Sequence, residues 1–169
     1  MENSVSRMAA VNYIKHYGIK SVVEFGCGLG KTTDFIKRLS GVYIIGVDIS
    51  ATAIQKAKQS YGEIEFHVDS VSNIKNYINT DCVYLSEITW YLLEGGLFDN
   101  MLNDILVYFK GKYVINNLVF YKGQQQYGVE YFTNINSFIK YCPFKLLGKV
   151  EVDFSEADTI ETSTIFRVP

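Results

Sequence analysis

The chain has 169 residues, which is enough for one domain with a substantial hydrophobic core and too few for two ordinary ones. Hydrophobic residues make up 48% of the sequence and charged residues 20%, a balance typical of folded proteins and not of disordered ones. Its 16 Lys and Arg residues against 18 Asp and Glu give a net charge of -2. A protein that binds nucleic-acid phosphates usually carries a basic surplus, so we expect no nucleic-acid partner.

Cysteine content and hydropathy bear on the compartment. The three cysteines are an odd number in no metal-like spacing, which favours a reducing compartment without a disulfide framework. No apolar run approaches the roughly 20 residues that a membrane span needs. Residues 1–18 lack the continuous apolar core of a signal peptide. We therefore expect a cytoplasmic protein with no membrane span and no metal site.

Short apolar runs alternate with amphipathic stretches along the chain. Apolar residues at helical spacing predict helices, and short β-branched runs that end at Gly or Asp predict strands. In chain order we expect a helix at 5–14, a strand at 21–25, a helix at 31–40, a strand at 42–47, a helix capped by Ser50 that runs to residue 58, a strand at 64–68, a short helix at 71–78, a strand at 82–85, a helix at 97–110, a strand that starts at 113–116, a helix at 135–139, and strands at 144–152 and 159–168.

These elements predict one α/β domain over residues 1–169. The apolar spacing places Met8, Leu39 and Ile78 on buried helix faces. The last two strands are joined by the acidic turn at 155–158, which is typical of an antiparallel hairpin. Alternating strands and helices before that hairpin predict a mostly parallel, doubly wound sheet with helices on both faces.

The strongest local motif is Glu24-Phe25-Gly26-Cys27-Gly28-Leu29-Gly30, which follows the first predicted strand and precedes a helix. Glycines there permit a tight turn and let a ligand lie against bare backbone, close to the positive end of that helix. Lys31 stands where the dinucleotide-binding pattern needs its last glycine, which disfavours a nicotinamide oxidoreductase. The phosphate-binding P-loop fails too, because Phe25 occupies the position of its first glycine. A purely structural turn is the alternative.

Two acidic residues end the next two predicted strands. Asp48 follows the second strand, where a carboxylate can accept both hydroxyls of a ribose. Asp69 follows the third strand and is placed to accept from an adenine amino group. Either residue could instead be a helix N-cap. Together with Glu24, both acids fall on the carboxyl edge of one sheet, where such folds bind ligands.

With these motifs, residues 20–168 resemble the class I S-adenosylmethionine-dependent methyltransferases. The loop from Glu24 to Gly30 matches the family's acidic-x-Gly-x-Gly-x-Gly pattern, and Asp48 matches its ribose-binding acid. The resemblance implies a Rossmann-like, seven-stranded sheet of order 3-2-1-4-5-7-6, with S-adenosylmethionine as cofactor and Glu24 near its methionine amino group. The cofactor-binding residues that we expect are Glu24, Gly26, Cys27, Gly28, Gly30, Asp48, Ile49, Asp69, Ser70 and Ser86.

The resemblance places acceptor-facing residues after the fourth strand. Glu87 is the first candidate for a general base, with an exposed loop carboxylate or a helix cap as the alternative. His67 is the second candidate, although its alternation with Phe66 and Val68 favours a solvent-facing histidine on an outer strand. The aromatic residues that could line an acceptor pocket, or pack in the core instead, are Trp90, Tyr91, Tyr121, Tyr127 and Tyr131.

The aromatic segments at 88–91 and 120–133 are similar to those of methyltransferases of bacterial glycan and surface-polysaccharide biosynthesis. We therefore expect methyl transfer to a small-molecule acceptor that is related to a sugar or a nucleotide sugar. Because only about 20 residues precede the first strand, a second copy of the chain or a partner subunit could cover the acceptor. The alternative function is a non-catalytic subunit that binds S-adenosylmethionine.

Overall fold

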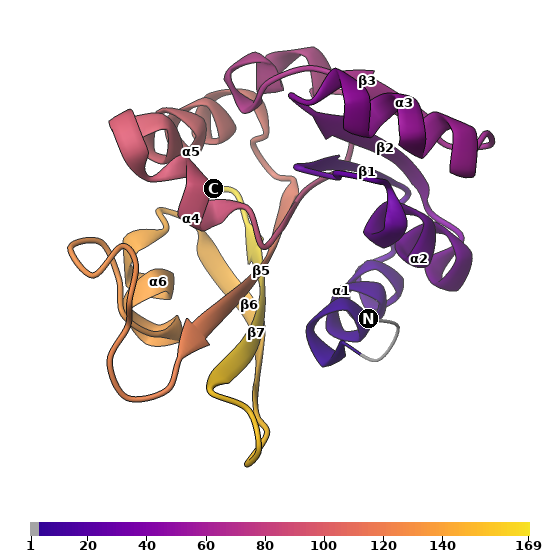
Figure 1. Ribbon diagram of the computed structural model, residues 1–169. Helices are drawn as coiled ribbons and strands as arrows, with labels where there is room; N and C mark the ends of the chain where they lie inside the picture. Colours follow the sequence, from indigo (N-terminus) through magenta and orange to yellow (C-terminus); the bar gives the residue numbers. More distant parts are fainter. Residues whose placement is uncertain (1–3) are drawn as a thin grey trace.

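The computed structural model describes residues 4–169 and contains one seven-stranded sheet, of order β3-β2-β1-β4-β5-β7-β6 (Figure 1). This is the predicted order. Strands β1 to β5 are mutually parallel, and β7 runs antiparallel between β5 and β6, which confirms the predicted hairpin. The strands are β1 (Ser21–Phe25), β2 (Tyr43–Asp48), β3 (Glu65–Val68), β4 (Cys82–Ser86), β5 (Tyr113–Tyr121), β6 (Lys145–Asp153) and β7 (Thr159–Arg167).

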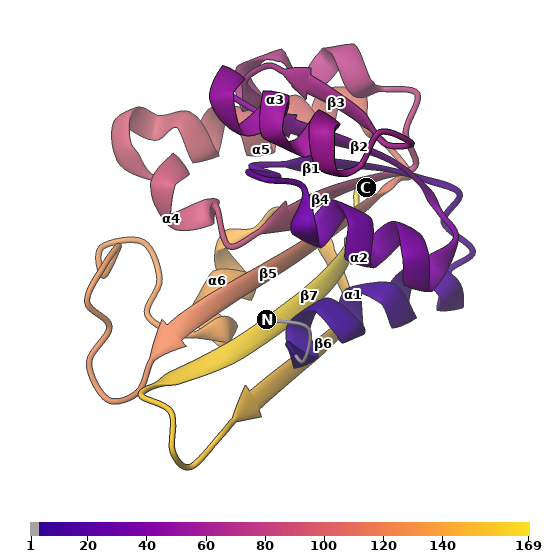
Figure 2. The same cartoon turned by 45° about the vertical axis from the view of Figure 1, so that its right-hand side comes forward.

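Helices cover both faces of the sheet (Figures 1 and 2). Helices α1 and α2 pack on one face, and η1, α5 and α6 pack on the other. Helix α3 covers β2 and β3. The helices are α1 (Val5–His16), α2 (Lys31–Ser40), α3 (Ala51–Ser60), α4 (Thr89–Leu92), α5 (Leu97–Tyr108) and α6 (Ile135–Tyr141), with short 3-10 helices η1 (Val71–Tyr77) and η2 (Glu94–Gly96).

Polar caps fix where several helices begin. The Ser50 hydroxyl accepts a hydrogen bond from the backbone of Ala53, as predicted, and Ser4 caps α1 in the same way. Helix α2 begins after Gly30 and ends before Gly41, both of which have positive φ. Because α2 starts directly after Gly30, the glycine loop leads into the first turn of a helix.

Three predicted core residues are exposed instead. Met8, Leu39 and Ile78 are 39%, 36% and 42% exposed. In α1, the small residues Ser6 and Ala9 take the inward face, because they let the helix lie close to the sheet. Helical spacing identified α1 and placed Val11 and Ile14 correctly in the core, but it was wrong for Met8.

The aromatic residues of the second half form much of the core between the sheet and α5 and α6. Phe98, Phe132 and Phe138 are nearly inaccessible and their rings contact one another. Strand β5 extends to Tyr121 because β7 supplies hydrogen-bonding partners along its full length. No helix within residues 4–169 is long and apolar enough to cross a bilayer.

Candidate functional site: the carboxyl ends of β1, β2 and β4

The glycine loop after β1 is fixed to β2. The N–H groups of Gly26 and Cys27 both donate to the carbonyl of Val47, at 2.8 and 3.0 Å. Gly26, Gly28 and Gly30 all have positive φ, which glycine adopts without strain.

The three glycines have different surroundings. A Cβ at Gly26 would lie 2.1 Å from the side chain of Ile88, and one at Gly30 would lie 2.7 Å from Phe66. A Cβ at Gly28 would meet nothing within 4 Å. Packing therefore requires glycine at the two ends of the loop, whereas the middle glycine opens onto free space that a ligand can occupy.

Glu24 lies on β1 beneath this loop and is only 1% exposed. Its Oε2 accepts a hydrogen bond of 2.6 Å from the Thr33 hydroxyl on α2, while its buried Oε1 has no partner. Burial raises the pKa of the Glu24 carboxyl to about 7, although the Thr33 hydrogen bond and the charge of Arg7 lower it. A buried acceptor without a partner is costly, so this oxygen is suited to receive a cationic donor such as an amino group.

Asp48, at the end of β2, connects the loop to the start of α3. Its Oδ2 accepts from the N–H of Gly28 and its Oδ1 from that of Ser50, both at 2.8 Å. Because Ser50 is the cap of α3, Asp48 is not that cap. Each carboxylate oxygen keeps a second lone pair for a hydroxyl donor. The neighbouring Ile49 is 78% exposed, which leaves an apolar surface beside this carboxylate.

Asp69, after β3, is already bonded within the protein. It accepts from the N–H of Ser70, from the Asn73 amide and from the Tyr77 hydroxyl. Partial burial opposes ionisation of Asp69, yet these hydrogen bonds lower the pKa of its carboxyl below the usual value. The hydroxyl of Ser70 caps η1, so Asp69 is not an N-cap either.

Glu87 follows β4 in an unusual backbone conformation. Within residues 4–169 it is the only non-glycine residue at positive φ, with a value of 63°. Its N–H donates to the carbonyl of Asn117, which holds this turn against β5. Such a conformation costs roughly 1–2 kcal/mol and recurs at functional sites. The next residue, Ile88, packs against Gly26, so the Glu87 turn adjoins the glycine loop.

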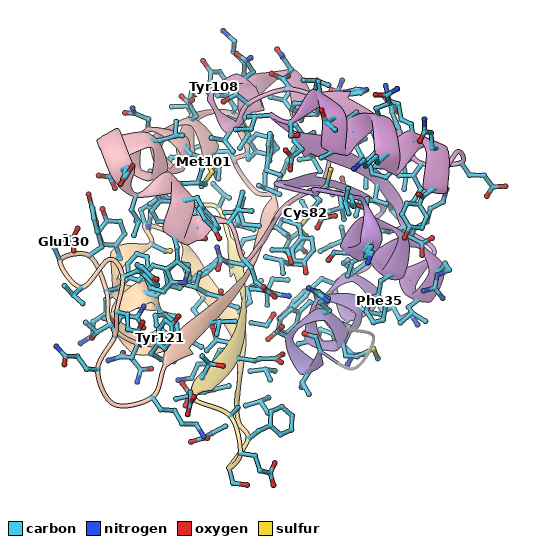
Figure 3. All side chains as sticks on the ribbon, in the orientation of Figure 1. Phe35, Cys82, Met101, Tyr108, Tyr121 and Glu130 are labelled. Atoms are coloured by element: carbon cyan, nitrogen blue, oxygen red, sulfur yellow. The ribbon has the colours of Figure 1, made fainter. Side chains whose placement is uncertain are left out.

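A cavity of about 510 Å³ opens on the other side of this turn. Figure 3 shows one of its residues, Tyr121, at the end of β5, beside the loop that carries Glu130. The indole N–H of Trp90 donates to the carbonyl of Val119, which fixes that ring in the wall. The residues that line the cavity are Glu87, Trp90, Tyr91, Val119, Tyr121, Tyr127 and Thr159.

Two of the predicted acceptor-side residues lie elsewhere. Tyr131 is outside the lining of this cavity: its hydroxyl donates to the carbonyl of Leu93 and its ring packs against the core. His67 pairs with Glu65 at 2.8 Å and contacts the Tyr77 hydroxyl, and it lines a different cavity on the β3 side. Neither residue shares the cavity of Glu87.

Sequence reasoning missed Arg7. This α1 residue places its guanidinium 3.5 Å from the Glu87 carboxylate, with only 14% of its side chain exposed. The sequence held no clear signal, because Arg7 is one of two Lys or Arg residues on α1 and nothing in the spacing links it to Glu87. The described part of the chain, from residue 4 onward, contains no group of three His, Cys, Asp or Glu side chains able to hold a metal ion.

Comparisons with known proteins agree with this geometry. Residues 22–105 match the family model of a methyltransferase domain. A segment of 55 residues is 36% identical to putative methyltransferase 235L of Invertebrate iridescent virus 6 and covers 32% of this chain. The match spans 21% of that viral protein, about a fifth of its length.

Solved structures of similar fold extend over nearly the whole chain. The methyltransferase domain of bacterial CtHen1 has a TM-score of 0.76 at 15% identity, covering 99% of this chain and 100% of that one. The N-methyltransferase NodS from Bradyrhizobium japonicum WM9, in complex with S-adenosylhomocysteine, has a TM-score of 0.72 at 15% identity, covering 96% and 86%.

The sheet order, with its antiparallel β7 and the glycine loop after β1, defines a class I methyltransferase fold. The matched methyltransferase domain lies within that fold and carries the loop and both strand-end acids. Residues 22–105 match a methyltransferase domain, and the chain as a whole has the fold of methyltransferases such as NodS, whose structure is known in complex with S-adenosylhomocysteine.

Proposed function

We propose that residues 1–169 act as one domain that transfers the methyl group of S-adenosylmethionine to a small, sugar-related acceptor. The observation that carries this proposal is the aromatic cavity beside Glu87, at the same strand ends as the glycine loop. The cofactor supplies a methyl group on a positively charged sulfur, which leaves as a neutral thioether. The protein therefore has to position two reactants more than to stabilise new charge.

The residues around the glycine loop would bind the cofactor. Glu24 Oε1 would accept from the amino group of the methionine, which gives this buried oxygen its missing partner. Gly28 would leave room for the ligand against the backbone, and Asp48 would accept from the ribose hydroxyls. Ile49 would cover one face of the adenine, with Asp69 and Ser70 at its edge. Cys27, whose thiol is buried, and Ser86 would complete the walls.

The methyl acceptor would bind in the cavity beside Glu87. Aromatic rings such as those of Trp90 and Tyr121 pack well against the apolar face of a sugar ring. The Glu87 carboxylate stands at the boundary between the cavity and the loop, where it can accept a proton from the attacking group. A role in glycan biosynthesis follows from this acceptor class.

The test separates binding from turnover. Calorimetry should detect binding of S-adenosylhomocysteine and no binding of NAD. An assay for S-adenosylhomocysteine release is then run against free sugars, amino sugars and nucleotide sugars. Turnover with members of this panel is the expected result. Binding of S-adenosylhomocysteine without methyl transfer to any acceptor would favour the non-catalytic subunit instead.

A further inference from the structure

We propose that the group that accepts the methyl is an amine, which the cavity beside Glu87 binds as its ammonium ion. This inference rests on the proposed function and narrows its substrate class. Three observations support the inference: the aromatic rings that line the cavity, the charges around the cavity, and the weakness of its carboxylate as a base.

The walls of the cavity are rich in ring faces. Four of its seven lining residues are aromatic, namely Trp90, Tyr91, Tyr121 and Tyr127. The rings of Tyr121 and Tyr127 lie 6.1 Å apart at an angle of 53°, so they form a corner and not a flat stack. Tyr91 and Tyr127 are 83% and 61% exposed, which leaves their rings open to contact by a ligand. Several ring faces around one space attract a cation.

The charges around the cavity favour a cation as well. Among the residues that the structure describes, 4–169, Glu87 is the only charged side chain in its lining. Arg7 lies 3.5 Å from Glu87, but the same guanidinium also acts on Glu24, so two carboxylates share one positive charge. The nearby Lys122 is bound to the Asp153 carboxylate and to the carbonyl of Phe154. An acidic acceptor would therefore find no cation directed into the cavity from its lining residues.

The available base discriminates between nitrogen and oxygen acceptors. The lining formed by the described part of the chain contains no histidine, lysine or cysteine, which leaves a carboxylate as the base. A carboxyl group has a reference pKa of about 4.3, which lies so far below that of an alcohol O–H that a carboxylate is a very weak base toward an alcohol. For an alkylammonium of pKa about 10.4 the gap is about 6 units. Such an amine is also present as the free base, in roughly one molecule in 2,500 at pH 7.

The proposed step balances without a further reactant. The ammonium gives one proton to the Glu87 carboxylate, which frees the lone pair on nitrogen. That lone pair forms the new bond to the methyl carbon as the carbon–sulfur bond breaks and its electron pair goes to sulfur. The product leaves as a methylated ammonium ion, which stays protonated near neutral pH, and the proton taken in the first step passes to solvent.

The single tryptophan of the chain makes the cavity directly observable, because Trp90 is in its wall. Choline and 3,3-dimethyl-1-butanol have the same shape and differ in charge. Each is titrated into the protein saturated with S-adenosylhomocysteine, while the fluorescence of Trp90 is recorded. N-acetyltryptophanamide in place of the protein corrects for collisional quenching. We expect choline to bind at least about tenfold more tightly than the neutral alcohol, the ratio that about 1.4 kcal/mol of cation–π and ionic attraction gives.

Two variants test which side chains cause the preference for choline over the alcohol. Glu87→Gln should reduce the choline preference and leave the affinity of the alcohol unchanged, and Tyr127→Leu should weaken choline more than the alcohol. In the turnover assay, glucosamine should be methylated and glucose should not. Equal binding of choline and the alcohol, no binding of either, or methylation of glucose alone would overturn the inference. Binding of S-adenosylhomocysteine, measured by calorimetry in the same samples, separates these results from a failure of the proposed function.

Discussion

Arg7 on α1 forms an ion pair with Glu87, which follows β4, with 3.5 Å between the guanidinium nitrogen and the carboxylate oxygen. Arg7 also lowers the pKa of the buried Glu24 carboxyl. One side chain thus links the residue at the methionine end of the proposed cofactor site with the residue at the acceptor cavity. Helix α1 is part of the site, although it precedes the matched methyltransferase domain in sequence.

Replacement of this cation should weaken cofactor binding at neutral pH. Without the charge of Arg7, the pKa of Glu24 should rise above about 7, so a smaller fraction of Glu24 is ionised and able to bind an amino group. Calorimetry at pH 7 should therefore show weaker binding of S-adenosylhomocysteine to Arg7→Met. The matched control is Lys15→Met, which removes an exposed cation from the same helix and should bind as the wild type does. Equal affinities for both variants would remove Arg7 from the site.

The raised pKa of Glu24 makes binding depend on pH. A carboxyl with a pKa of about 7 is roughly nine-tenths ionised at pH 8 and one-tenth at pH 6. Because the charged form is the one that pairs with an amino group, affinity for S-adenosylhomocysteine should fall about tenfold from pH 8 to pH 6. Calorimetry in two buffers of different ionisation enthalpy should detect the proton released at pH 6. Glu24→Gln is the control, and a pH dependence that persists in it would assign the effect to another group.

Gly28 can be tested against a second glycine of the same backbone type. Gly28→Val fills the open space above the loop and should reduce affinity for S-adenosylhomocysteine by more than about a hundredfold, through collision with the ligand. Gly41 also has positive φ and open surroundings, but lies at the far end of α2. Both substitutions should cost roughly 1–2 kcal/mol of stability, measured by urea unfolding. A folded Gly28→Val protein that binds as well as Gly41→Val would show that the ligand does not approach this residue.

The fold could be predicted from the sequence because its signals are local. Each parallel strand is a short apolar run that ends at a glycine or an acid, and those ends meet at one edge of the sheet. The motif from Glu24 to Gly30 and the resemblance it carries therefore gave the correct strand order. The face of α1 was less predictable, since Met8 is exposed while the small Ser6 packs inward.

The site was only partly predictable because its parts come from distant segments. Arg7 is 80 positions from Glu87, and no periodicity links the two. Tyr121 and Tyr131 belong to the same tyrosine-rich segment, yet only Tyr121 lines the cavity. The pairing of β5 with β7 extends to Tyr121, and this pairing between remote residues determines which ring faces the cavity.

The two strand-end acids should contribute unequally to cofactor binding. Asp48 is proposed to accept two ribose hydroxyls and already fixes the N–H of Gly28, so Asp48→Ala loses ligand contacts and loop order together. Asp69 already accepts three hydrogen bonds, from Ser70, Asn73 and Tyr77, which leaves less capacity for a ligand. We expect a loss of about 3 kcal/mol, more than a hundredfold, for Asp48→Ala and about tenfold for Asp69→Ala. Calorimetry with S-adenosylhomocysteine checks this, and equal small losses would mean that both acids serve only to order their turns.

Glu87 should show a conflict between stability and activity. Its positive φ is strained for any side chain, by roughly 1–2 kcal/mol. Glu87→Gly and Glu87→Gln both lose the ion pair with Arg7, and only Glu87→Gly loses the strain, so Glu87→Gly should have the higher free energy of unfolding of the two in urea titrations. Both Glu87→Gly and the nearly isosteric Glu87→Gln should keep the affinity for S-adenosylhomocysteine, because the side chain lies on the acceptor side. Turnover should fall by about 10²–10⁴ in each, the range for a lost proton acceptor. Since Glu87→Gln keeps the strain and Glu87→Gly removes it, equal turnover losses assign the effect to the carboxylate. Near-normal turnover of Glu87→Gln would show that the acceptor is positioned and not deprotonated by this residue, and that the aromatic walls around Trp90 carry the catalysis.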